Sequence, residues 1–175
     1  RPEEILRSAE LCLTHGIHVG MGFMIGIPGE TWKEMRRTFD IMDELEAIGV
    51  TVAPGPSSYF PYPGTPLFAE AVRRGFVTPG SIQDWVSATW GSLRAFFPYV
   101  DRRARNVGYY RSLAMRQESG RRGFALMLAP LKRLARWRWR HRFFYFPVDQ
   151  KIPHWILLGL QKIGLKKYAM GIYDK

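Results

Sequence analysis

The chain has 175 residues, of which 46% are hydrophobic, so it is long enough and apolar enough for an ordinary folded domain, and disorder along its whole length is excluded. Residues 1–98 hold 8 Lys and Arg against 11 Asp and Glu, whereas residues 99–175 hold 18 against 4, so the basic half is expected to face something anionic. The single cysteine, Cys12, excludes an internal disulfide and a metal site built from cysteines of this chain. No stretch resembles a secretory signal or a membrane-spanning segment, and we expect a cytoplasmic protein.

Helical and extended patterns alternate over the first half of the chain. Residues 3–15 predict a helix, and residues 17–25 form a near-continuous apolar run that predicts a strand buried on both faces. Residues 31–48 predict a second helix and residues 50–59 a second strand. This alternation is typical of a parallel α/β sheet or barrel.

A third helix is predicted after the second strand, with Thr65 as its cap, Pro66 as its first residue and Gly75 at its end. In the second half, Ser81 and Asp84 resemble a capping box in which Asp replaces Glu, and helical spacing continues from residue 82 to Pro98. Residues 102–118 predict a further helix, rich in arginine and tyrosine.

Two loops rich in glycine and proline follow the two predicted strands, at residues 26–31 and 61–66. In parallel α/β folds, ligands bind beyond the carboxyl ends of the strands. Glycine in such a loop lets the backbone approach a ligand closely, and proline fixes the shape of the loop. Each loop alone is equally consistent with a tight turn, and Glu30 with a carboxylate favoured by the dipole at the start of a helix.

Taken in order, the segments "EEILRSAELCLTHGIHV", "GFMIGIPGET" and "YFPYPGTPLFAEAVRRGFV" resemble the later half of the barrel of radical S-adenosylmethionine (SAM) enzymes. The resemblance covers residues 3–78 and is closest to the branch that carries a cobalamin-binding domain upstream. It implies the C-terminal part of a partial (β/α)6 TIM-type barrel over residues 1–78, with residues 17–25 and 50–59 as the fifth and sixth strands. Residues 79–175 would form a mostly helical, basic extension.

The resemblance also implies cofactors and a reaction. In that family a [4Fe–4S] cluster binds SAM and cleaves it reductively to a 5′-deoxyadenosyl radical, and the upstream domain of this branch holds cobalamin. The reactions of the branch include methylation, cyclisation and rearrangement of lipids, tetrapyrroles or secondary metabolites. A small-molecule or lipid-like substrate is therefore expected.

The site residues follow from the family's fifth-strand motif, GxIxGxxE. In this chain the motif maps onto residues 22–26 with its acid at Glu30, one residue later than in the strict pattern. Glu30 is expected to bind backbone N–H groups at the start of the helix rather than to act in catalysis. The residues expected to contact SAM or to shape its pocket come from the fifth strand, its loop and the sixth strand: Met24, Ile25, Gly26, Pro28, Gly29, Glu30, Ser57, Tyr59 and Phe60.

The cluster-binding motif of the family, CxxxCxxC, does not occur in this chain, and Cys12 is expected to be a small thiol buried on a helix. The chain by itself is therefore expected to be inactive, as the C-terminal part of a longer enzyme. The competing hypothesis is a non-enzymatic, peripheral membrane-binding α/β module.

Residues 120–146 combine alternating Arg and Trp with four aromatic residues in a row, "FFYF". Arginine and tryptophan favour the headgroup layer of an anionic membrane. Basic residues interleaved with aromatic ones also bind single-stranded nucleic acid, which is disfavoured here because no RNA-binding module pattern accompanies them. The third alternative is a helical cap whose aromatic side chains are buried and whose arginines are solvated.

Overall fold

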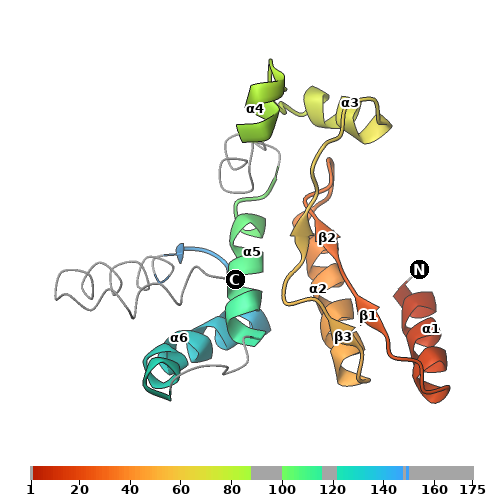
Figure 1. Cartoon of the computed structure of the whole chain (residues 1–175), viewed down its shortest axis with the longest axis vertical. Coiled ribbons are helices and arrows are strands. Elements are labelled where there is room, and N and C mark those ends of the chain that lie inside the picture. The colour runs from red at the N-terminus through yellow and green to blue at the C-terminus, as the bar shows by residue number, and fades with distance from the viewer. Residues whose placement is uncertain (1, 88–99, 116–121, 148, 150–175) are drawn as a thin grey trace. The chain divides into compact units, whose positions relative to one another are not determined.

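The computed structural model describes residues 2–87, 100–115, 122–147 and 149 (Figure 1). The chain divides into two compact units, Arg1–Phe144 and Tyr145–Lys175, and the described helices and strands all lie in the first. That unit is a mixed α/β structure with short parallel strands. Its elements are α1 (Pro2–Thr14), β1 (Gly20–Met21), β2 (Met24–Ile25), α2 (Trp32–Ala47), β3 (Thr51–Val52), β4 (Ser57–Ser58), α3 (Pro66–Arg73), α4 (Ile82–Ser87), α5 (Ala104–Met115) and α6 (Arg122–Arg140).

The helix starts follow local chemistry and confirm the sequence predictions. Thr31 caps α2, and its hydroxyl and backbone N–H form a reciprocal capping box with Glu34. Thr65 caps α3 with Pro66 as the first helical residue, as predicted. At α4, Asp84 Oδ2 accepts a hydrogen bond from the backbone N–H of Ser81 at 3.1 Å, which is the predicted capping box.

Both predicted strands are present, but each is divided in two. β1 pairs with β3 and β2 pairs with β4, all in parallel. The partners are Gly20 with Thr51 and Met24 with Ser57, so four residues of the first strand lie opposite six of the second. The two extra residues fall within Ala-Pro-Gly-Pro at residues 53–56. Proline has no N–H for the ladder, which explains why pairing stops there.

The helix α5 passes close to the bulge at residues 53–56. A Cβ added to Gly55 would lie 3.2 Å from both the Cα and the carbonyl oxygen of Gly108, and 3.3 Å from Ser112 Oγ. Two glycines facing each other therefore let the backbone of α5 pass against the bulge.

One face of the paired strands is buried and the other is open. Every second residue of the first strand packs into or against the main core: Val19, Met21, Phe23 and Ile25. Ile25 is 2% exposed. The helix α2 covers this face (Figure 1), and its core residues Met35, Phe39, Met42 and Leu45 have no more than 1% of their surface exposed. Burying each such side chain contributes about 1.5–3 kcal/mol.

The opposite face carries the exposed residues Gly20, Gly22 and Met24, with Thr51 and Ser57 beside them on the partner strands. We call these five residues the open face. The prediction that residues 17–25 are buried on both faces is therefore wrong for the structure described. The strand alternates between buried and exposed residues, but the exposed positions 20 and 22 are glycines, so the sequence shows no polar side chains there.

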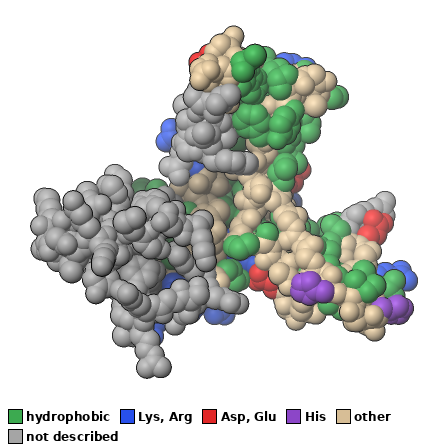
Figure 2. All heavy atoms as spheres, in the orientation of Figure 1, with side chains coloured by type: hydrophobic (Ala, Val, Ile, Leu, Met, Phe, Trp, Pro, Cys, Tyr) green, Lys and Arg blue, Asp and Glu red, His purple; other side chains and the backbone are tan. Residues whose placement is uncertain are grey.

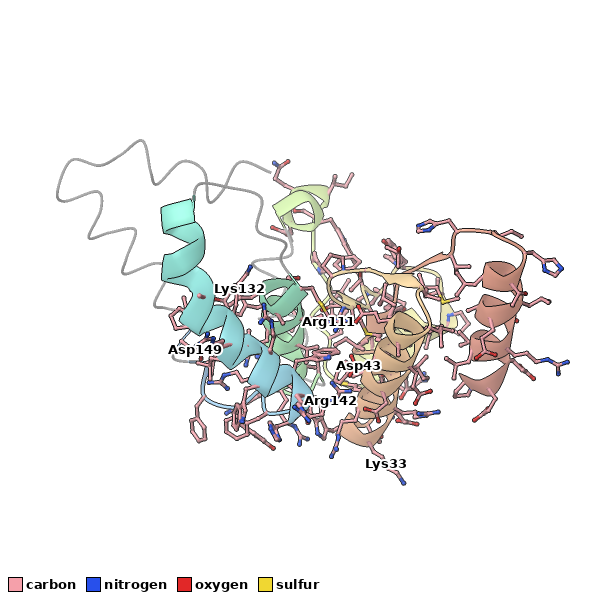
Figure 3. The ribbon with its side chains drawn as sticks, turned by 90° about the horizontal axis from the view of Figure 1, so that it is seen from below. Lys33, Asp43, Arg111, Lys132, Arg142 and Asp149 are labelled. Atoms are coloured by element: carbon pink, nitrogen blue, oxygen red, sulfur yellow. The ribbon has the colours of Figure 1, made fainter. Side chains whose placement is uncertain are left out.

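The core beneath α2 also contains residues of α5 and α6. These helices lie beyond residue 78, where the sequence predicted the barrel part to end and the basic extension to begin. Trp139 of α6 donates a hydrogen bond from Nε1 to Asp43 Oδ1 at 2.8 Å. Two guanidinium groups contact its ring, that of Arg111 at 4.4 Å and that of Arg142 at 4.7 Å from the ring centroid. Arg111, with none of its side chain exposed, pairs with Asp43 and Glu46, and Arg142 Nη2 lies 2.7 Å from Asp43 Oδ2 (Figure 3).

This cluster, formed by Arg111, Trp139 and Arg142 against the acids of α2, joins helices far apart in sequence. Burial lowers the pKa of Arg111, while the carboxylates of Glu46 and Asp43 oppose that effect. Trp139 and Phe144 are thus buried, as the helical-cap alternative predicts, but Arg138 is buried with them and the side chain of Arg142 is only 9% exposed, whereas that alternative has its arginines solvated. Among the helices described, none has both the length and the apolar character needed to cross a membrane.

Candidate functional site

The two glycine- and proline-rich loops begin at the same end of the paired strands. The backbone N–H of Tyr59 donates to the carbonyl oxygen of Ile25 at 2.8 Å, and this is the last bond of the ladder. Directly after it, the chain enters the loop of residues 26–30 on one side and that of residues 60–65 on the other. The expectation that both loops lie beyond the carboxyl ends of neighbouring parallel strands is confirmed.

The first loop is held by its own carboxylate. Glu30 Oε2 accepts hydrogen bonds from the backbone N–H groups of Gly26, at 2.6 Å, and Ile27, at 3.2 Å. Glu30 therefore binds backbone N–H groups, but those of the loop that precedes it rather than the expected ones at the start of the helix. Burial raises the pKa of the Glu30 carboxyl, the two backbone hydrogen bonds oppose this increase, and the charge of Glu34 adds to it. Because the carboxylate occupies these N–H groups, they are not available to a phosphate.

The same loop is bounded by residues that come from elsewhere in the chain. Gly26 and Gly29 have φ values of +79° and +93°, which side chains other than glycine rarely adopt. A Cβ on Gly29 would lie 3.3 Å from Nη2 of Arg74, and a Cβ on Gly26 would lie 3.4 Å from a methyl of Val100. Sequence reasoning missed Arg74 and Val100 as neighbours of this loop, because each is more than forty residues away and no local pattern connects them to it.

Ser57, Tyr59 and Phe60 follow the second strand in different environments. Ser57 is exposed on the open face beside Met24, and Tyr59 is half-buried. Phe60 instead belongs to an aromatic cluster, with its ring centroid 5.5 Å from that of Tyr62 and 5.8 Å from that of Trp85. Trp85 is a further residue that the sequence did not assign to the site.

Around this aromatic cluster, the molecule exposes apolar side chains. Figure 2 shows hydrophobic side chains gathered over α3 and α4. The exposed members include Tyr62, with 64% of its surface accessible, Leu67, Val72, Val77 and Ile82. An apolar surface next to the two loops fits an apolar or lipid-like ligand better than a highly charged one.

The two residues expected to contact adenine point to opposite faces of the strand. The side chain of Ile25 is 2% exposed and packs in the core, whereas that of Met24 is 50% exposed on the open face. Met24 is therefore the candidate for side-chain contact with a ligand. Within the loop, Gly26 and Pro28 are buried and Gly29 is exposed.

The part of the chain that the structure describes contains no group of three or more His, Cys, Asp or Glu side chains placed to hold a metal ion. Cys12 is half-buried on α1, so it is less buried than expected. With one cysteine, this chain does not fit a [4Fe–4S] cluster by itself, because such a cluster takes several thiolate ligands.

No family model, curated protein or solved structure shows a significant match to this chain. The geometry of the open face and its two loops therefore carries the functional argument.

Proposed function

We propose that this chain is the C-terminal part of a radical SAM enzyme, in which residues 17–25 and 50–59 are the fifth and sixth strands of a partial (β/α)6 TIM-type barrel. The observation that carries the proposal is the open face. Parallel strands are normally covered on both sides, and within the part of the chain that the structure describes only the side against α2 is covered. In a barrel the uncovered side would be the interior, and its ligand would sit where the two loops begin.

In this proposal each residue has a limited physical role. Met24 packs its thioether chain against the adenine of SAM, because it is the exposed apolar side chain next to the strand end. Gly22 and Gly26 allow the backbone to approach the nucleoside, and Glu30 fixes the loop through its two hydrogen bonds. Ser57 lies beside Met24 and supplies a hydroxyl for hydrogen bonding.

The remaining expected residues complete the pocket. Tyr59 continues from the sixth strand, and Phe60 places the aromatic cluster next to the loops, which favours an apolar or lipid-like substrate. Bound to a [4Fe–4S] cluster held by residues outside this chain, SAM would supply a radical for methylation, cyclisation or rearrangement. Cobalamin would be held by an upstream domain of the same enzyme.

The coding sequence upstream of Arg1 tests this proposal directly. We expect a CxxxCxxC motif followed by about a hundred residues of alternating strand and helix patterns, since a barrel needs roughly 25–30 residues per strand–helix unit. The purified longer protein should then contain iron and sulfide and absorb visible light. An intact gene without such a motif would remove the cluster and favour the competing hypothesis of a non-enzymatic membrane-binding module.

A further inference from the structure

The helix α6 presents two different faces, and the cluster that binds α2 uses one of them. Its buried face includes Leu131, Ala135 and Trp139, of which Trp139 is 6% exposed. The opposite side contains four exposed residues of α6 and the residue directly after the helix, at spacings of three and four: Arg133, Arg136, Trp137, Arg140 and His141. We call these five residues the outward face. Of the alternating Arg and Trp residues, Arg138 and Trp139 are therefore buried, whereas Arg136, Trp137 and Arg140 are exposed.

The outward face combines positive charge with exposed aromatic rings. Its three arginines come from consecutive turns of α6, so they lie along about 10 Å of the helix. Trp137 is 48% exposed, and its ring centroid lies 5.0 Å from that of His141 and 5.8 Å from that of Phe143, which is 37% exposed.

The sequence that forms this face is basic and lacks acidic residues. Residues 119–148 contain no Asp or Glu at all, although they contain eight Lys and Arg. Asp43 of α2, which lies against the buried side of α6, already pairs with Arg111 and Arg142. Among the described residues, no ion pair involves Arg133, Arg136 or Arg140.

We propose that the outward face of α6 docks onto an anionic phospholipid surface. The arginines supply charge complementarity to the phosphate and carboxylate headgroups, while Trp137 and Phe143 enter the interfacial layer, where a ring that is partly apolar and partly polar is favoured. A single convex helix face with mixed Arg and aromatic side chains suits a flat surface. A nucleic-acid strand would instead be expected to lie in a groove with successive stacking platforms. The inference is independent of the proposed SAM chemistry.

Flotation of the full chain with vesicles tests the inference. We expect binding to vesicles of phosphatidylcholine with phosphatidylglycerol at low salt, weaker binding at high salt, and no binding to phosphatidylcholine alone. Each basic residue near an anionic surface contributes roughly a fivefold change in partition. The triple variant Arg133→Gln, Arg136→Gln, Arg140→Gln is therefore expected to bind about a hundredfold more weakly, and Trp137→Ala several-fold more weakly.

A matched control separates this face from net charge. The triple variant Arg7→Gln, Lys33→Gln, Arg36→Gln removes the same three charges from exposed positions of α1 and α2. It is expected to bind within about fivefold of the wild type, the effect of one charge. Equal losses in the two triple variants would show a nonspecific charge effect and overturn the inference.

Two other results would also overturn it. If the outward-face triple variant floats as well as the wild type, the membrane contact lies elsewhere in the chain. If vesicles fail to bind while a single-stranded oligonucleotide binds the wild type and not that variant, the partner of the face is nucleic acid. Circular dichroism checks that all variants remain folded, which is expected because every substituted side chain is exposed.

Discussion

The buried guanidinium of Arg111 provides a quantitative test of how α5 and α6 are fixed to α2. In Arg111→Met, the aliphatic part of the side chain is kept, while the ion pairs with Asp43 and Glu46 and the contact with the ring of Trp139 are lost. Removing one partner of a buried ion pair costs about 3–5 kcal/mol, because the remaining charge is left uncompensated.

Two features of the site adjust that estimate. The side chains of Asp43 and Glu46 are 40% and 27% exposed, so water compensates part of the loss, and Asp43 keeps Arg142 as a partner. The cation–π contact over Trp139 adds about 1–2 kcal/mol. We therefore expect Arg111→Met to lower the free energy of unfolding by about 2–4 kcal/mol.

The assay is urea unfolding followed by far-ultraviolet circular dichroism, at low and high salt. Arg37→Met is the matched control, because Arg37 pairs with Glu44 at 2.7 Å while both side chains are more than 40% exposed. Exposed pairs are screened and contribute little, so the control should unfold with the wild type. If both variants lose the same stability, or if high salt abolishes the effect of Arg111→Met, the argument from burial is wrong.

Two further predictions concern the strands and the first loop. Gly55→Ala places a methyl 3.2 Å from the backbone of Gly108 and is expected to lower the free energy of unfolding by about 1–3 kcal/mol in urea unfolding; unchanged stability would contradict the close approach. The pKa of the Glu30 carboxyl is raised in the folded protein, so the folded state binds the carboxyl proton more tightly than the unfolded state does. Protonated Glu30 therefore stabilises the fold below the ordinary pKa of 4.5, and this stabilisation is lost as pH rises through the raised pKa. The stability of the wild type relative to Glu30→Gln should therefore fall as pH rises above about 4.5, and a difference independent of pH would refute this cause.

The sequence predicts the elements whose signals are local. The helix starts at Thr65 and Ser81 were predicted because capping depends on residues within three positions of each other, whereas the helix from residue 31 was predicted from its apolar spacing and its cap at Thr31 was not. The meeting of the two loops was also predictable, since the carboxyl ends of neighbouring parallel strands share one edge.

The features that the sequence did not predict depend on long-range packing or on glycine. Gly20 and Gly22 have no side chains to mark a face, so a one-sided strand had the pattern of a strand buried on both sides. The contact of Arg111 with Glu46 spans 65 residues, and no periodicity connects them. The division of the Arg/Trp stretch into inward and outward halves likewise depends on which side of α6 meets α2.

The central claim is that a nucleoside lies against the open face, and titration of SAM tests it most directly, in the longer, cluster-containing protein of which we propose this chain is a part. A Cβ on Gly22 would meet nothing within 4 Å, so Gly22→Ala should leave the unfolding midpoint unchanged. It should nevertheless weaken SAM binding at least tenfold, about 1.4 kcal/mol, because the methyl would occupy the space of the ligand. Gly20→Ala, about 6.6 Å farther from the strand end, should bind SAM as the wild type does. If Gly22→Ala binds SAM as tightly as the wild type does, the ligand is not on this face and the account is contradicted.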